Sequence, residues 1–163
     1  MKIAMQYSDI DWIALGDDDV RYTHDFFESI SSSSKAYKDI LCFTGSVKYE
    51  NNTIQLDHRR TIKNFITLKQ TNISESQYKN NFYIDIFSFV GVVINKKVIE
   101  DIGLPIKDYF IWCDDTEYAL RVRRCTKILN VSSAIIYHDT VNSKNTKFSL
   151  NWKTYYGKRN NIL

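Results

Sequence analysis

Residues 11–20, with the sequence DWIALGDDDV, join a short apolar run to a cluster of acidic residues. Four apolar residues at positions 12–15 run almost directly into three adjacent carboxylates, Asp17, Asp18 and Asp19. A short apolar run of this kind predicts a buried strand, and open α/β folds bind their ligands at the carboxyl ends of strands. Carboxylates crowded at such a point repel one another by roughly 1 kcal/mol per close pair. The triplet therefore destabilises the fold unless a cation neutralises it.

The spacing within the triplet favours a divalent ion. Asp17 and Asp19 are two residues apart, so in extended backbone their side chains point the same way, while Asp18 points elsewhere. Mg²⁺ and Mn²⁺ prefer oxygen ligands, and an imidazole can complete such a site. His138 closes the apolar run AIIYH, whereas the other two histidines fall in stretches expected at the surface. A solvated acidic turn that binds nothing is the alternative that this local pattern leaves open.

A second acidic cluster stands at the start of a predicted helix, in the stretch CDDTEYALRVRR that begins at residue 113. Asp114 and Glu117 match a capping box, with Asp114 as the N-cap residue and Glu117 bonding back to it. This assignment leaves Asp115 in the first turn, where the helix dipole favours an ionised carboxylate. An ionised carboxylate can accept a proton from a hydroxyl group as general base, or it can serve only as a favourable first-turn acid.

The composition of the whole chain favours one folded domain over residues 1–163. The chain is 44% apolar and 14% aromatic, enough for a core, and its net charge is only +3. Arg121, Arg123 and Arg124 are close in sequence, but a helix spreads them around its axis, so we expect no nucleic-acid partner. Three cysteines without a C-x-x-C pair indicate a reducing compartment, and no run of about 18 apolar residues occurs. We therefore expect a cytoplasmic protein.

The remaining pattern predicts an α/β domain with a mixed sheet. We expect helices over residues 23–32, 96–101, from 114 onward and from 148 onward, and strands over residues 12–15, 40–48, 53–60, 82–94, 128–131 and 134–138.

Together, these motifs resemble a known family. The triplet DDD, the stretch IGLPIKDYFIWCDDTEYALR (residues 102–121), a strand ending in His138 and the tail YYGKRN (residues 155–160) occur in this order. The set resembles the inverting family-2 glycosyltransferases with the GT-A fold, in particular the galactofuranosyltransferase- and rhamnosyltransferase-like bacterial enzymes. The resemblance extends from Trp12 to Asn160.

The resemblance implies roles for individual residues. Asp17 and Asp19 match the Asp-x-Asp motif, which binds Mn²⁺ or Mg²⁺ on the diphosphate of a nucleotide-sugar donor, and His138 matches the histidine that often completes this site. Asp115 matches the general base that deprotonates the acceptor hydroxyl in a single, inverting displacement. Further residues that the resemblance implies in substrate binding are Asp18, Trp112, Asp114, Glu117 and Arg159.

The resemblance also implies the partners. The donor is a UDP- or dTDP-linked sugar, and the acceptor is a glycan or a lipid-linked glycan, which would bring the protein to the inner membrane face as a peripheral protein. The family carries a nucleotide-binding half before the Asp-x-Asp strand, whereas eleven residues precede Trp12 here. We therefore expect a partial GT-A fold whose N-terminal nucleotide-binding strands are missing, with weak nucleotide affinity and little turnover alone. An exposed sheet edge would favour self-association.

Two other interpretations compete with glycosyl transfer. In the first, the chain is a non-catalytic remnant or scaffold of the same fold, in which the motifs persist without activity. In the second, DDDV belongs to a phosphatase of the haloacid dehalogenase type. Arg21 disfavours the phosphatase, because it stands where that nucleophile loop would carry Thr or Val.

Overall fold

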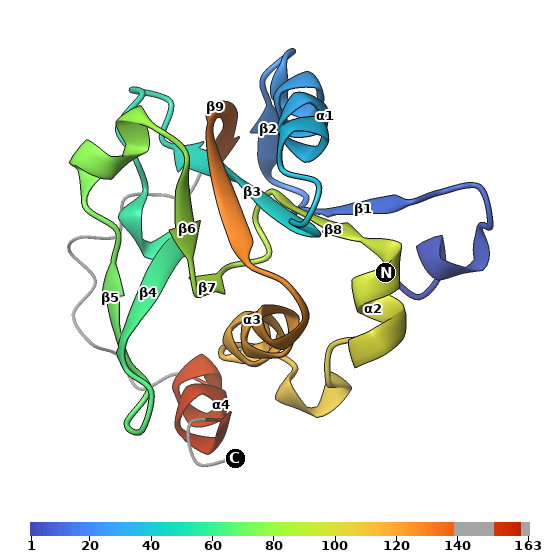
Figure 1. Ribbon diagram of the computed structural model, residues 1–163. Helices are drawn as coiled ribbons and strands as arrows, with labels where there is room; N and C mark the ends of the chain where they lie inside the picture. Colours follow the sequence, from blue (N-terminus) through green and yellow to red (C-terminus); the bar gives the residue numbers. More distant parts are fainter. Residues whose placement is uncertain (139–151, 161–163) are drawn as a thin grey trace.

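The structure is a computed structural model, and it describes residues 1–138 and 152–160. Its main sheet has six strands, five of them in the order β1-β8-β3-β9-β2 (Figure 1). The sixth, β6, pairs with the start of β9, whereas β2 pairs with its end. The pair β3–β9 is parallel and the other pairs are antiparallel, so the sheet is mixed, as expected. The strands are β1 (Trp12–Leu15), β2 (Val20–Tyr22), β3 (Cys42–Lys48), β6 (Phe82–Ile84), β8 (Val92–Asn95) and β9 (Ile128–His138).

A second sheet of three strands, in the order β5-β4-β7, lies beside the main sheet. Its strands are β4 (Arg59–Asn64), β5 (Lys69–Asn72) and β7 (Ile86–Phe87). The expected hairpin over residues 53–60 is wrong beyond its start. Ile54 forms a bridge with Lys48, but the chain then makes a 3-10 turn and enters the second sheet at Arg59.

Helices cover both faces of the main sheet. α1 (Phe26–Ala36) lies on one face, and α2 (Lys96–Ile102) and α3 (Asp114–Cys125) lie on the other (Figure 1). α4 (Trp152–Asn160) packs against the segment that precedes α3. None of the helices in the described part of the chain combines the length and apolarity that crossing a bilayer requires. The 3-10 turns are η1 (Ala4–Gln6), η2 (Leu56–His58), η3 (Glu75–Lys79) and η4 (Lys107–Tyr109).

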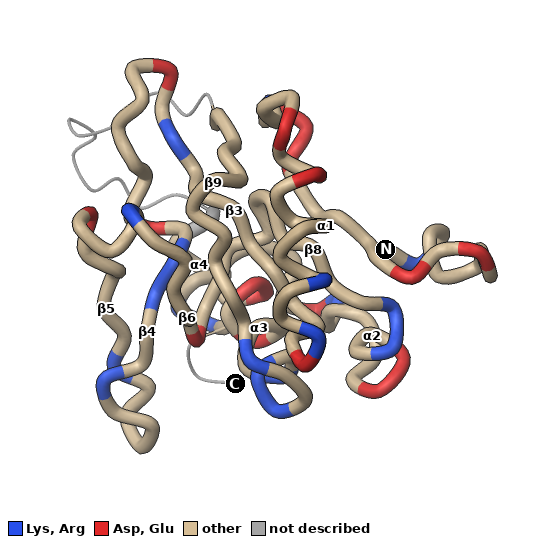
Figure 2. The backbone as a smooth tube through the Cα atoms, turned by 45° about the horizontal axis from the view of Figure 1, so that its top comes forward, with Lys and Arg blue, Asp and Glu red and all other residues tan. Residues whose placement is uncertain are grey.

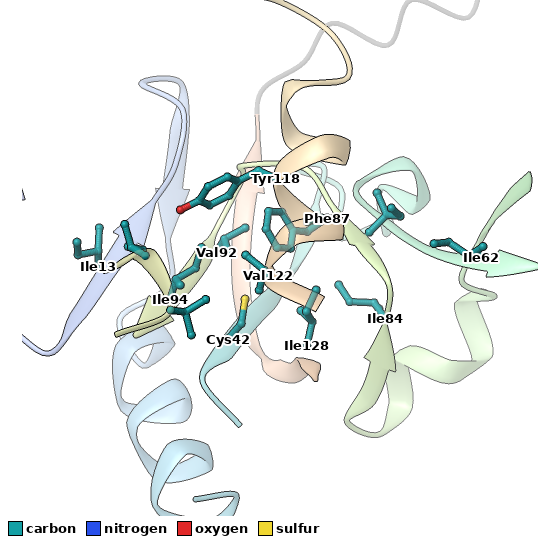
Figure 3. Close-up of a cluster of buried hydrophobic side chains, with 14 of the residues drawn as sticks. Ile13, Cys42, Ile62, Ile84, Phe87, Val92, Ile94, Tyr118, Val122 and Ile128 are labelled. Atoms are coloured by element: carbon teal, nitrogen blue, oxygen red, sulfur yellow. The ribbon is translucent and has the colours of Figure 1, made fainter. Parts of the chain in front are cut away.

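The strands of the main sheet send alternate residues into two cores, as the period of two in a strand requires. Phe43 and Val93 pair across β3 and β8, and both pack in the core beneath α1. Their neighbours Cys42 and Ile94 also pair, and they pack on the opposite face around Val122 of α3 (Figure 3). Burial on both faces explains why these strands read as nearly continuous apolar runs in the sequence.

The long strand β9 brings distant segments together. The sequence predicted two short strands here, but the structure has one strand of 11 residues with a register shift opposite Gly45 and Ser46. Beyond the shift, β9 pairs with β2, which the sequence analysis did not predict because β2 has only three residues. This pairing sets His138 opposite Val20, next to the acidic triplet.

A buried arginine joins the two sheets. Arg59 is fully buried, and its guanidinium donates hydrogen bonds to the carbonyl oxygens of Gly45 (3.0 Å) and Val90 (2.7 Å) and to Oδ1 of Asn130 (3.2 Å). It also donates to the carbonyl of His58 (2.9 Å). Among the described residues no carboxylate pairs with Arg59, so backbone and amide oxygens satisfy this charge.

Candidate functional site

The acidic triplet and His138 converge at the ends of three strands. β1 leads into the triplet, β2 leaves it, and the pairing of β2 with β9 holds His138 beside it. Nε2 of His138 lies 3.3 Å from Oδ1 of Asp19. One ligand atom from each of Asp17, Asp19 and His138 lies within 4.8 Å of the others. These are the three residues that the sequence analysis selected as metal ligands, while Asp18 is exposed and lies outside this cluster.

The electrostatics of this cluster are those of an anionic site. Burial raises the pKa of the Asp17 carboxyl, the imidazole of His138 opposes that shift, and the carboxylates of Asp19, Asp18 and Asp114 add to it. Repulsion between carboxylates is relieved by a bound cation. Two carboxylates and one imidazole form a donor set that suits Mn²⁺ or Mg²⁺.

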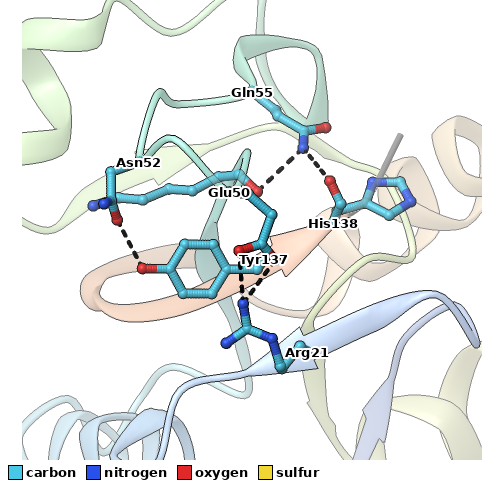
Figure 4. Close-up of polar contacts among 7 residues, drawn as sticks. Arg21, Glu50, Asn52, Gln55, Tyr137 and His138 are labelled. Atoms are coloured by element: carbon cyan, nitrogen blue, oxygen red, sulfur yellow. Dashed lines mark hydrogen bonds and ion pairs between the residues drawn. The ribbon is translucent and has the colours of Figure 1, made fainter. Parts of the chain in front are cut away.

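A second layer of polar residues holds His138 in place. Nε2 of Gln55 donates to the carbonyl of His138 (2.8 Å) and to that of Lys48 (3.2 Å), as Figure 4 shows. Oε1 of Gln55 is therefore the acceptor for Nε2 of His58 (3.0 Å), and Nδ1 of His58 accepts from the hydroxyl of Ser88 (2.5 Å). The His58 ring packs edge-on against the His138 ring, with centroids 5.3 Å apart.

His58 was expected at the surface, and the structure corrects this expectation. Its side chain is largely enclosed, and burial lowers its pKa to about 3, with the charges of Arg59, His138 and Arg60 acting in the same direction. His58 is therefore a neutral hydrogen-bonding group at physiological pH. Nothing in the local sequence signalled this, because the contact joins residues 80 positions apart.

An ion pair and a ring contact secure the strand ends next to His138. Arg21 of β2 pairs with Glu50 at 2.7 Å, and its guanidinium lies 4.7 Å from the centroid of the Tyr137 ring. The Tyr137 hydroxyl donates to Oδ1 of Asn52 (2.7 Å), as Figure 4 shows. These contacts tie β2, the end of β9 and the turn after β3 together.

The second acidic cluster lies at the start of α3, but the expected capping box is wrong. The N-cap residue is Cys113, and Asp114 and Asp115 are the first two helical residues. Cys113 and Trp112 have φ values of 65° and 63°, a left-handed conformation that β-carbon sterics disfavour. The chain thus enters α3 one residue earlier than predicted. Glu117 does not bond back to the cap, because its carboxylate pairs with Arg121 at 2.6 Å.

The C-terminal tail holds this strained segment. Nδ2 of Asn160 lies within hydrogen-bonding distance of three carbonyl oxygens, those of Tyr109 (2.8 Å), Ile111 (3.0 Å) and Trp112 (2.7 Å). The guanidinium of Arg159 donates to the carbonyl of Asp108. Arg159, which the resemblance implied in substrate binding, and Asn160 therefore both bind the backbone that leads into α3.

A pocket of about 390 Å³ opens beside Asp115. Oδ1 of Asp115 accepts hydrogen bonds from the backbone N–H (2.6 Å) and the hydroxyl (3.2 Å) of Thr116. Burial raises the pKa of Asp115, and the Arg60 guanidinium opposes that shift. Arg60 in turn donates to Oε1 of Gln70 (2.7 Å). Trp112, half exposed, lines the same pocket.

Arg60, Gln70 and Thr116 were not selected from the sequence. Arg60 and Gln70 reach the pocket from the second sheet, more than 40 residues away in the chain, and no motif marked them. A second groove of about 490 Å³ adjoins the pocket and shares Gln70, Cys113 and Thr116 with it. Glu117 lines this groove, and its partner Arg121 also donates to the carbonyls of Ile102, the last residue of α2, and of Leu104.

The two acidic clusters act on one another. Asp114, the residue before Asp115, is among the charges that raise the pKa of Asp17. The two acidic clusters therefore interact electrostatically through Asp114 and Asp17.

The fold is similar to that of solved GT-A proteins. A crystal structure of GalNAc-T7 with UDP, GalNAc and Mn²⁺ matches with a TM-score of 0.61 and 11% identity, over 84% of this chain and 29% of that chain. A crystal structure of A197 from STIV matches with a TM-score of 0.58 and 14% identity, over 86% of this chain and 63% of that chain. This chain thus spans less than two thirds of either protein.

These similarities confirm an α/β fold of the GT-A type with a mixed sheet. At such low identities they show the fold alone. No family model and no curated protein matches the sequence, so membership of glycosyltransferase family 2 stays a prediction.

Proposed function

We propose that this protein is a metal-dependent, inverting glycosyltransferase module over residues 1–163, which moves a sugar from a nucleotide-diphosphate donor to a hydroxyl acceptor. The observation that carries the proposal is the convergence of Asp17, Asp19 and His138 within 4.8 Å at the end of β1, in a fold of the GT-A type. The UDP, GalNAc and Mn²⁺ in the GalNAc-T7 structure support a UDP-linked donor and a manganese cofactor.

In the proposed reaction, Asp17, Asp19 and His138 hold Mn²⁺ or Mg²⁺. When bound, the ion offsets the negative charge that develops on the departing diphosphate. We assign donor binding also to Asp18, which is exposed beside this cluster, and to Asp114, whose charge acts on Asp17.

Asp115 is the proposed general base. Its Oδ1 is engaged by Thr116, which leaves Oδ2 for the acceptor hydroxyl. The proton of that hydroxyl moves to Oδ2, the acceptor oxygen bonds to the anomeric carbon, and the bond to the diphosphate breaks with its electron pair on the diphosphate. A raised pKa makes the carboxylate a stronger base, while Arg60 favours its ionised form. Trp112 offers an aromatic face to a sugar ring at the pocket.

A transfer assay tests this proposal. Release of nucleoside diphosphate from UDP- and dTDP-linked sugars is measured with and without Mn²⁺, for the wild type and for Asp19→Ala and Asp115→Asn. We expect Asp19→Ala to lose both Mn²⁺ affinity and transfer. Asp115→Asn should keep Mn²⁺ affinity and lose about 10²–10⁴-fold in transfer rate.

Two outcomes contradict the proposal. A wild-type chain that does not bind Mn²⁺ in calorimetry removes the metal site. A chain that binds Mn²⁺ but transfers no sugar from any donor, even when an upstream nucleotide-binding segment is supplied together with hydroxyl acceptors, supports the non-catalytic scaffold instead.

A further inference from the structure

The tip of the hairpin between β4 and β5 carries large apolar side chains into solvent. Residues 63–69 read KNFITLK, and Phe65, Ile66 and Leu68 are 54%, 94% and 45% exposed. Turns are normally built from Gly, Pro, Asn, Asp and Ser. An isoleucine that is 94% exposed buries almost nothing in the fold, so folding does not account for it. A cluster of such residues marks a contact surface.

The tip has a fixed shape. Oδ1 of Asn64 accepts hydrogen bonds from the backbone N–H groups of Ile66 (2.9 Å) and Thr67 (3.0 Å), which closes the turn. The guanidinium of Arg123 in α3 lies 4.5 Å from the centroid of the Phe65 ring. In Figure 1 the hairpin extends to the end of the molecule opposite α1, with Ile66 within its terminal turn.

The tip carries exposed positive charge and no negative charge. The hairpin, residues 59–72, contains neither Asp nor Glu, and of its basic residues Arg59 is buried and Arg60 lines the pocket, whereas Lys63 and Lys69 are exposed. Lys63 and Lys69 flank the apolar residues, and Figure 2 shows basic residues on both arms of the hairpin. Within residues 1–138 and 152–160, Lys63, Lys69 and the nearby Arg124 form no ion pair. Their charges are therefore available to an anionic partner.

We propose that this tip docks on an anionic lipid bilayer. Apolar side chains at a fixed turn can enter the boundary between headgroups and acyl chains, while flanking lysines reach the lipid phosphates with their long stems. A second copy of this chain fits less well, because a symmetric contact between two tips would bring like charges together. Charge complementarity thus favours the lipid surface.

Docking would place the groove beside Asp115 at the membrane surface. Leu68 of the tip and Arg124 of α3 line the groove that adjoins the Asp115 pocket. An acceptor carried on a lipid could enter from that side. Bilayer binding is nonetheless independent of glycosyl transfer, so it can be tested even if the proposed function fails.

Vesicle co-sedimentation tests this docking directly. The full chain is mixed with phosphatidylcholine vesicles and with vesicles in which about one quarter of the lipid is phosphatidylglycerol. We expect binding to the anionic vesicles alone, and we expect it to weaken strongly at about 0.5 M salt. Ile66→Asp should reduce the partition coefficient for anionic vesicles by at least about tenfold. Lys63→Gln combined with Lys69→Gln should reduce it by about fivefold per lysine.

Matched variants far from the tip serve as controls. Ile3, near the N-terminus, is 72% exposed, so Ile3→Asp tests the loss of an exposed isoleucine away from the tip. Lys35→Gln with Lys38→Gln removes two exposed lysines near the end of α1. Neither control should alter vesicle binding. Because the altered side chains are exposed, all variants should keep the wild-type melting temperature.

Three results would overturn the proposal. One is a wild-type chain that stays in the supernatant with anionic vesicles. Another is an equal effect of Ile66→Asp and Ile3→Asp. The third is self-association in analytical ultracentrifugation that Ile66→Asp abolishes without any vesicle binding, which would assign the tip to a second copy of the chain.

Discussion

The side-chain amide of Asn160 donates a hydrogen bond to the carbonyl of Trp112 at 2.7 Å, and so the last residue of α4 fixes the residue two positions before the second acidic cluster. Trp112 and Cys113 are left-handed, and such residues persist only where surrounding contacts hold them. Asn160 is buried and supplies those contacts. It acts on the candidate base by positioning the backbone in front of it.

Replacing Asn160 by Ala should release this segment. We expect a loss of about 1–3 kcal/mol in the free energy of unfolding, because partly buried carbonyl oxygens lose their donor. Asn160→Asp should be worse, since it sets a carboxylate against three carbonyls. In an active chain, KM for the acceptor should rise while Mn²⁺ affinity stays constant. Asn72→Ala, which removes one exposed hydrogen bond to Asp57, is the control and should change neither quantity. A purely structural role for Asn160 would lower stability without separating KM from Mn²⁺ affinity.

Asp17→Asn should stabilise the metal-free protein and abolish its response to metal. Removing one of the clustered charges relieves repulsion, which we expect to raise the free energy of unfolding by up to about 1 kcal/mol at low salt. Mn²⁺ raises the melting temperature of the wild type by mass action, and the variant should lose that increase. Asp18→Asn, outside the cluster, should keep it. Equal Mn²⁺ responses of the two variants would argue against a site built on Asp17.

The low pKa of His58 predicts that the stability of the protein falls as the pH is lowered. Its pKa is about 3 in the folded protein against 6.5 for a free histidine, so below pH 6.5 the unfolded state binds the proton first. Stability from this group is fully present above pH 6.5 and is lost as the pH falls toward 3, by up to roughly 1.4 kcal/mol per pH unit. Urea unfolding at a series of pH values should show a flatter profile for His58→Gln than for the wild type. His24→Gln, at an exposed position, should retain the wild-type slope.

Gly157→Ala should displace Trp112 without unfolding α4. A methyl group at this position would overlap the indole ring of Trp112. Alanine favours a helix over glycine by about 1 kcal/mol, which offsets part of the steric cost. We expect near-wild-type stability, altered tryptophan fluorescence and weaker acceptor binding. Lys158→Ala, on the exposed side of α4, is the matched control and should leave the fluorescence unchanged.

The candidate metal site could be predicted from the sequence because its residues lie at or just after the ends of strands with strong local patterns. The apolar run before Asp17 predicted β1, and the run AIIYH predicted a strand ending at His138. What local patterns could not supply was the pairing that joins them. β2 is too short and polar to stand out, yet its pairing with β9 is the contact that brings His138 to the triplet.

Only one side of the pocket beside Asp115 could be predicted from the sequence. Its α3 side followed from a helix start signal, although backbone geometry at Cys113 shifted that start by one residue. Its other side comes from Arg60 and Gln70, which reach it through the pairing of β4 with β5. Periodicity describes which face of a strand is buried, but it does not say which other strand lies opposite.

The guanidinium of Arg59 links the two parts of the proposed reaction centre. Arg59 belongs to β4 of the second sheet, and its guanidinium donates to Gly45 of β3 and Asn130 of β9 in the main sheet. The main sheet leads into the triplet, and the second sheet carries Arg60 of the pocket. A lysine could not replace Arg59, because an ammonium lacks the planar fork that reaches several oxygens at once. A buried cation therefore helps to hold together the two sheets that carry the two halves of the proposed reaction centre.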